Sequence, residues 1–199
     1  ITAKKTVPKE FQPYISFPNG KPGSIESDAT RPLAWQRKND LFYAWWDGTG
    51  AENRIFLPKH HMTQRLKNAR AVNMARAYFY KKYLADYKKG LSLKGASLTN
   101  FKGDFGLVGL LSAGLDLTEQ FVGSMKIDIQ VDGNGENLLF VISNTTSATS
   151  AAYHMWGSYT RDQEPQGGNL NQVYIFKEPI TNAGFMLTEG GSTSQRFTK

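Results

Sequence analysis

Polar side chains that could carry out chemistry gather in two parts of this 199-residue chain. Arg76 and Tyr80 lie one turn apart on the same side of a predicted helix, next to its buried face. An arginine beside an apolar surface is costly unless it meets a carboxylate or an anionic ligand. We therefore expect Arg76 to face the junction between helix and sheet, with Glu119 as its partner.

The remaining candidates lie in the second half of the chain and along the same helix. Together with Arg76, Glu119 and His154 are the candidate catalytic residues. The candidate ligand-binding residues are Tyr80, Gln120, Asn144, Thr146, Lys67, Arg70 and Lys81. An ion pair that only joins the two halves explains Arg76 and Glu119 at least as well, because structural and catalytic ionic networks look alike in a sequence.

Two histidines, His60 and His61, follow Lys59 at a predicted helix start. In a nuclease such a group would supply a general base and a phosphate-binding cation. Adjacent histidines do not share a helix face, so they form a poor metal-binding pair compared with histidines four residues apart. A surface pair is the simpler interpretation.

A calcium loop is suggested by the spacing of Asp132, Asn134 and Glu136, but the pattern then fails. Asn137 and Ser143 occupy the positions where an EF-hand requires glycine and glutamate. We interpret the segment as a turn. We predict no metal site, and the residues indicate no particular cofactor. The nucleophile elbow, the phosphate-binding loop, the dinucleotide fingerprint and the zinc-protease motif are all missing, so no reaction is defined.

The composition is that of a globular protein, with 40% hydrophobic and 21% charged residues. With no cysteine, the chain forms no disulfide and carries out no thiolate chemistry. Residues 1–102 carry 19 Lys and Arg against seven Asp and Glu, whereas residues 103–199 carry five against ten. The basic half suggests nucleic acid, an anionic lipid-containing surface or an acidic protein as partner. Alternatively, the two halves neutralise each other.

A long amphipathic helix is predicted over residues 62–89. Apolar residues recur there at helical spacing, and the segment from Lys59 to Lys89 contains nine Lys and Arg but one acid, Asp86. Bound to phosphates, these cations would hold a nucleic acid in place without sequence preference. A solvated basic face is the alternative.

The centre of the chain changes from helical to strand-like spacing. Residues 106–117 predict a core helix that is too short to span a membrane stably, since about 20 apolar residues are needed. Strict alternation over residues 125–131, a turn over 132–136 and a return strand over 138–142 predict a β-hairpin. Further short strands are predicted over 153–160 and 172–176.

Four prolines make residues 1–30 an extended arm. The aromatic residues of 32–46 are expected to pack in the core or to stack bases of a single strand. We predict one α+β domain over 31–189, helical over 31–122 and β-rich over 123–189, followed by a flexible tail over 190–199. The aromatic-rich half and the basic helix would pack on a C-terminal antiparallel sheet.

Several segments, in order, resemble a known family. They are NMARAYFYKKY at 73–83, GASLTNFKGDFGL at 95–107, AGL at 113–115, EQFVGS at 119–124, SNTTS at 143–147 and KEP at 177–179. Together they resemble the variable C-terminal domains of RHS (YD-repeat) polymorphic toxins, especially those of Bacteroidetes. The first 55 residues show no such likeness.

The resemblance implies a secreted toxin domain that an RHS shell carries and that is delivered into a competing bacterial cell. It also implies a cognate immunity protein that protects the producer. Such domains include nucleases, pore formers, NAD-consuming enzymes and hydrolases of lipid-linked wall precursors, so the resemblance implies no single activity. Two alternatives stay open, a non-catalytic module that binds nucleic acid or an anionic surface through the basic helix, and a pore-forming domain.

Overall fold

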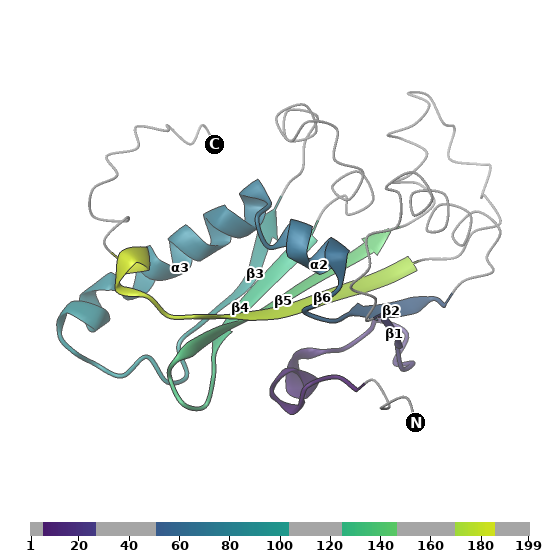
Figure 1. Cartoon of the computed structure of the whole chain (residues 1–199), viewed down its shortest axis with the longest axis horizontal. Helices are drawn as coiled ribbons and strands as arrows, with labels where there is room; N and C mark the ends of the chain where they lie inside the picture. Colours follow the sequence, from purple (N-terminus) through teal and green to yellow (C-terminus); the bar gives the residue numbers. More distant parts are fainter. Residues whose placement is uncertain (1–5, 27–50, 104–124, 147–169, 186–199) are drawn as a thin grey trace.

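A six-stranded mixed β-sheet organises the computed structural model, which describes residues 6–26, 51–103, 125–146 and 170–185 (Figure 1). In chain order the elements are η1 (Lys9–Tyr14), β1 (Ser24–Glu26), β2 (Asn53–Phe56), α2 (His61–Leu66), α3 (Arg70–Lys88), β3 (Ser97–Gly103), β4 (Met125–Val131), β5 (Asn137–Thr146) and β6 (Leu170–Pro179). The strands lie in the order β1-β2-β6-β5-β4-β3. This part of the chain is therefore α+β, as predicted.

The predicted hairpin is confirmed as β4 and β5. Met125, Ile127, Ile129 and Val131 are buried, and the residues between them on β4 are more exposed. The connecting turn has Gly135 at a φ of +80°, a conformation that glycine adopts without steric cost. In β5, leucine, phenylalanine, valine and isoleucine are buried on both faces, so this strand lies inside a three-layer arrangement.

The two faces of the sheet have different covers. Figure 1 shows α2 and α3 on one face and the N-terminal segment, coloured purple, on the other. The helix face buries Phe79, Phe140 and Tyr174 among many other apolar side chains. On the opposite face, Phe11 of η1 packs with Val141 and Val173 in a smaller cluster. We call these the helix face and the arm face.

The sheet is mixed rather than purely antiparallel, which corrects the prediction. Strands β3 to β6 pair antiparallel, but β2 pairs parallel with both β6 and β1. Both β1 and β2 come from the first 56 residues, where we predicted an arm and helices. The four residues of β2 are too few to show a period. These four residues form a strand because they pair with β6. Strand β6 is central, since Val173 to Phe176 are buried on both faces and β6 pairs with a strand on each side.

The predicted long helix is interrupted. Helix α2 ends at Leu66 and α3 begins at Arg70, because Ala69 adopts an extended conformation with ψ of 147°. Met62, Leu66, Ala69 and Val72 are nevertheless all buried. The helical spacing of apolar residues therefore continues across the interruption between α2 and α3, and periodicity alone could not reveal that interruption.

Part of the predicted arm is folded onto the sheet. Pro13 lies within η1, a 3₁₀ turn that carries the buried Phe11, and β1 joins the sheet edge. Several predictions concern residues that the structure does not describe. These are the helix at 106–117, the strand at 153–160, the aromatic segment at 32–46, the tail at 190–199 and the boundaries after residues 30, 122 and 189.

Candidate functional site

One terminus of each of the six strands lies at the same end of the sheet. Strands β1, β2, β4 and β6 begin there and β3 and β5 end there, as their pairing registers show. We call this the polar end, because Asn53, Asn144, Asn171 and Gln172 are all buried there. Buried amides need hydrogen-bond partners, so we expect each of these side chains to be bonded to a neighbouring group.

Three asparagines from separate elements bind one another at the polar end. Asn171 donates through Nδ2 to Oδ1 of Asn53 at 2.8 Å, and Asn53 donates to Oδ1 of Asn19 at 2.8 Å. Thr145 donates its hydroxyl to Oδ1 of Asn171 at 2.9 Å. This amide cluster ties the arm to β2, β6 and β5, and we assign it a structural role.

Behind the amide cluster, on the helix face, two further polar side chains are committed to the fold. Tyr174 stacks on Phe56 and donates its hydroxyl to Oε1 of Gln172 at 2.5 Å. Burial raises the pKa of Tyr174 far above that of an exposed phenol, so it stays neutral. His60 is buried and its Nδ1 accepts from the backbone N–H of Met62, which caps α2.

An open groove of about 680 Å³ lies beside the amide cluster on the arm face. The N-terminal segment contributes Tyr14 and Phe17, among others, and Val141 and Val173 contribute from the sheet. The arm packs against β2, β6 and β5, and no other element of the described ranges packs on the same face of β4 and β3. The polar residues that line it from the arm face of the strands are Lys102, Lys126, Asp128, Ser143, Thr145 and Asn171. Asn144 and Gln172 also line it, but strand alternation with Ile142 and Tyr174 places their side chains on the helix face.

The groove carries an excess of positive charge. Lys102 and Lys126 are direct cross-strand partners on β3 and β4. Lys126 Nζ lies 3.0 Å from Oδ2 of Asp128, while Lys102 has no ionic partner among the described residues. The other oxygen of Asp128 accepts from the backbone N–H of Asn100 at 2.7 Å, where β3 bulges. The groove lining therefore holds two ammonium groups and one carboxylate.

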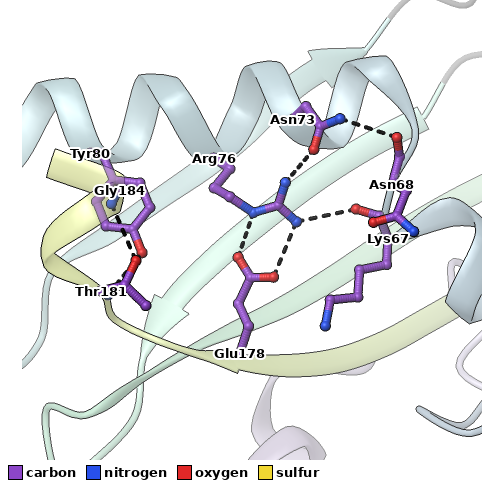
Figure 2. A network of polar contacts seen from close by, with 8 residues as sticks. All are labelled: Lys67, Asn68, Asn73, Arg76, Tyr80, Glu178, Thr181 and Gly184. Atoms are coloured by element: carbon purple, nitrogen blue, oxygen red, sulfur yellow. Dashed lines mark hydrogen bonds and ion pairs between the residues drawn. The ribbon is translucent and has the colours of Figure 1, made fainter. Parts of the chain in front are cut away.

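Arg76 lies at the junction between helix and sheet, as expected, but its partner is Glu178 (Figure 2). Its Nε and Nη2 donate to the two carboxylate oxygens at 2.5 and 3.1 Å. Nη2 also donates to the backbone carbonyl of Lys67 at 3.1 Å, and Nη1 donates to Oδ1 of Asn73. The predicted partner, Glu119, lies outside the described residues.

The predicted site residues are divided between the two faces. Tyr80 is buried on the helix face, where its hydroxyl accepts weakly from the backbone N–H of Thr181 at 3.4 Å (Figure 2). Arg70 and Lys81 are exposed on α3, whereas Asn144 lines the groove. Thr146 ends β5, and its side chain is not described. Gln120 and His154, like Glu119, lie outside the described residues.

Sequence reasoning missed the two groove lysines. Alternation over β4 does place Lys126 and Asp128 on one face, which was the available signal. The strand β3 was not predicted, so nothing in the sequence showed that Lys102 stands opposite Lys126.

No helix in the described ranges is long and apolar enough to cross a membrane. Within the same ranges, no three histidine, aspartate or glutamate side chains cluster as metal ligands would. Comparison of the chain with protein-family models, curated proteins and solved structures finds no match.

Proposed function

We propose that the chain is a toxin effector domain, delivered into competing bacterial cells as the C-terminal part of an RHS-type polymorphic toxin. Its partners would be the RHS shell of the parent protein and a cognate immunity protein in the producer. The observation that carries this proposal is the ordered resemblance described above, together with the way the resembling segments contact one another.

Three of the resembling segments, 73–83, 95–107 and 177–179, contact one another through residues that the structure describes. Arg76, in the segment 73–83, binds Glu178, in the segment 177–179. Tyr83, in the first segment, uses its hydroxyl both to donate to the carbonyl of Ser97 at 2.8 Å and to accept from its N–H at 3.0 Å. Segments that resemble one family in sequence and also contact one another support the interpretation that they belong to one shared fold. A shared fold does not identify a reaction, because one fold hosts many functions.

Growth of bacteria that express residues 1–199 tests the proposal. Expression in the cytoplasm, or separately in the periplasm, should stop growth in at least one compartment. Cytoplasmic killing would indicate nucleic acid or nucleotide targets, and killing only from the periplasm would indicate membrane or wall targets. A chain with both Arg76→Ala and Glu178→Ala, expressed at the same level, controls for the burden of expression. Harmless expression in both compartments would contradict the proposal.

A non-catalytic binding module is the second candidate, and the exposed cations of α3 favour it. Arg70, Lys81, Lys82 and Lys88 are all exposed, so α3 would serve as the basic amphipathic helix of such a module. A binder would saturate at stoichiometric amounts and would leave DNA, RNA, NAD and lipid-linked wall precursor chemically unchanged. A pore-forming domain would instead release dye from liposomes, through the segment 106–117, which lies outside the described residues.

A further inference from the structure

We propose that the groove on the arm face binds a nucleoside phosphate, with Lys102 and Lys126 on the phosphate. The proposal concerns binding and does not depend on the effector function, because it is measured on the purified chain. It is based on three features of the groove: a pair of cations of which only one charge is offset by a carboxylate, polar groups beside them, and aromatic rings from the arm.

The cation pair is the first step of the argument. Like charges that stand directly opposite each other on neighbouring antiparallel strands destabilise the sheet. Lys102 and Lys126 have this relation, and Asp128 offsets one charge while also holding the bulge at Asn100. A dianion between the two ammonium groups would remove the repulsion. Lysine is suited to phosphate as a compact point charge.

The polar end of the sheet supplies the next contacts. Ser143 is the cross-strand partner of Lys126 on β5. Lys102, Lys126 and Ser143 therefore lie in one row across β3, β4 and β5. The Ser143 hydroxyl makes no hydrogen bond within the described ranges, so it can bind a ligand oxygen. Thr145 lies two residues further along the same face, and its oxygen keeps lone pairs after donating to Asn171. Such groups suit the hydroxyls of a sugar.

Aromatic side chains from the arm complete the groove. Tyr14 lines it and is 40% exposed, and Phe17 also lines it. A flat ring on the ligand can stack on such a surface, and base stacking is worth roughly 1–3 kcal/mol in single-strand binders. The volume of about 680 Å³ is in the usual range for small-molecule sites. Phosphate, sugar and base would therefore each have a counterpart.

Isothermal titration calorimetry of the purified chain tests this proposal with AMP, adenosine, inorganic phosphate and a four-nucleotide oligoadenylate. AMP should bind more tightly than either adenosine or phosphate, because only AMP reaches both the cations and the aromatic rings. Tighter binding of the oligonucleotide would identify nucleic acid as the source of the ligand, and equal or weaker binding would identify free nucleotide. Equal affinity for AMP and inorganic phosphate would overturn the proposal.

Four variants locate the binding. Lys102→Gln and Lys126→Gln should each weaken AMP binding about tenfold, as expected for one charged hydrogen bond. Asp128→Asn keeps the oxygen that Asn100 uses and removes the opposing charge, so it should strengthen binding up to about fivefold. Lys94→Gln makes the same change of charge at an exposed lysine beside the β4–β5 turn, at the other end of the sheet, and should have no effect.

Circular dichroism distinguishes lost binding from lost folding. Lys102→Gln removes a like-charge contact, so its melting temperature should equal or exceed that of the wild type. If no probe binds the wild type at millimolar concentration, the proposal is wrong. It is equally wrong if Lys94→Gln weakens binding as much as the two groove variants do.

Discussion

Arg76 joins four parts of the structure, so Arg76→Lys is a sharp test of what holds α3 on the sheet. The guanidinium binds both oxygens of Glu178, the side chain of Asn73 and the carbonyl of Lys67, at the break between the two helices. It also lies over the ring of Phe140, 5.3 Å from the ring centroid. Lysine keeps the charge but loses the planar fork, so it can satisfy only part of this set.

The size of the effect follows from the contacts and from their burial. Removing one partner of a fully buried pair costs about 3–5 kcal/mol, and exposed pairs contribute about 0–1 kcal/mol. The side chains of Arg76 and Glu178 are 21% and 13% exposed, which is between these limits. Since lysine restores one bond, we expect a loss of about 2 kcal/mol, equivalent to about 4–8 °C in melting temperature for a chain of this size.

Urea unfolding followed by circular dichroism measures this loss. The midpoint should fall while the slope of free energy against urea stays the same, because the folded state stays equally compact. Arg70→Lys is the matched control, since Arg70 is exposed on the same helix, and it should change stability by less than about 0.5 kcal/mol. Comparing Glu178→Gln, Arg76→Lys and the double variant then gives the coupling energy of the pair.

Two results would refute this reasoning. If Arg76→Lys unfolds like the wild type and toxicity is kept, the contacts contribute nothing measurable. If it unfolds like the wild type but toxicity is lost, Arg76 acts in function rather than in holding the helix. A joint loss of stability and toxicity is the result we expect.

Two other perturbations test the polar end and the hairpin. Asn53→Ala removes the side chain that connects Asn19 and Asn171 and leaves buried amide groups unsatisfied. Urea unfolding should show that the free energy of unfolding falls by about 2–3 kcal/mol. An unchanged urea midpoint would contradict the structural role of the amide cluster. Asp132 accepts hydrogen bonds from two backbone N–H groups and from the side chain of Asn137 in the β4–β5 turn. Burial raises the pKa of Asp132, but these hydrogen bonds outweigh it and hold the pKa below the ordinary 3.8. A depressed pKa stabilises the fold above the unfolded-state value and ceases to do so as pH falls through the folded-state value. Asp132→Asn should therefore have a lower free energy of unfolding than the wild type at pH 7, and this difference should shrink as the pH falls below 3.8. An equal difference at every pH would refute this account of Asp132.

The sequence predicts the centre of the fold better than its edges, for physical reasons. Strand β4 alternates strictly because one face is buried under α3, so its period was visible. Strand β1 has three residues and β2 has four, and their place is decided by pairing with distant segments. Glu178 was missed as the partner of Arg76 because β6 extends to Pro179, beyond the predicted end at residue 176.

The candidate site was harder to predict than the fold because it depends on register. Lys102 and Lys126 are 24 positions apart in the chain, and only the bulge in β3 places them opposite each other. Asn144 was predicted from its polar surroundings, and its role as a ligand-binding residue stays a prediction. Arg76 was predicted from its position beside an apolar face, a signal that does not distinguish an ion pair in the scaffold from a ligand site.

The two faces of the sheet therefore give different information in an experiment. On the helix face, α3 is joined to β6 through Arg76 and Glu178, so changes there act on stability first. On the arm face, Lys102 and Lys126 repel each other in the folded chain, so removing either costs the fold little. If toxicity depends on the groove, the lysine variants lose it with their melting temperature intact, whereas Arg76→Lys loses both together. A toxin whose chemistry lies elsewhere would keep its activity in the lysine variants, which distinguishes the scaffold, the groove and any other site.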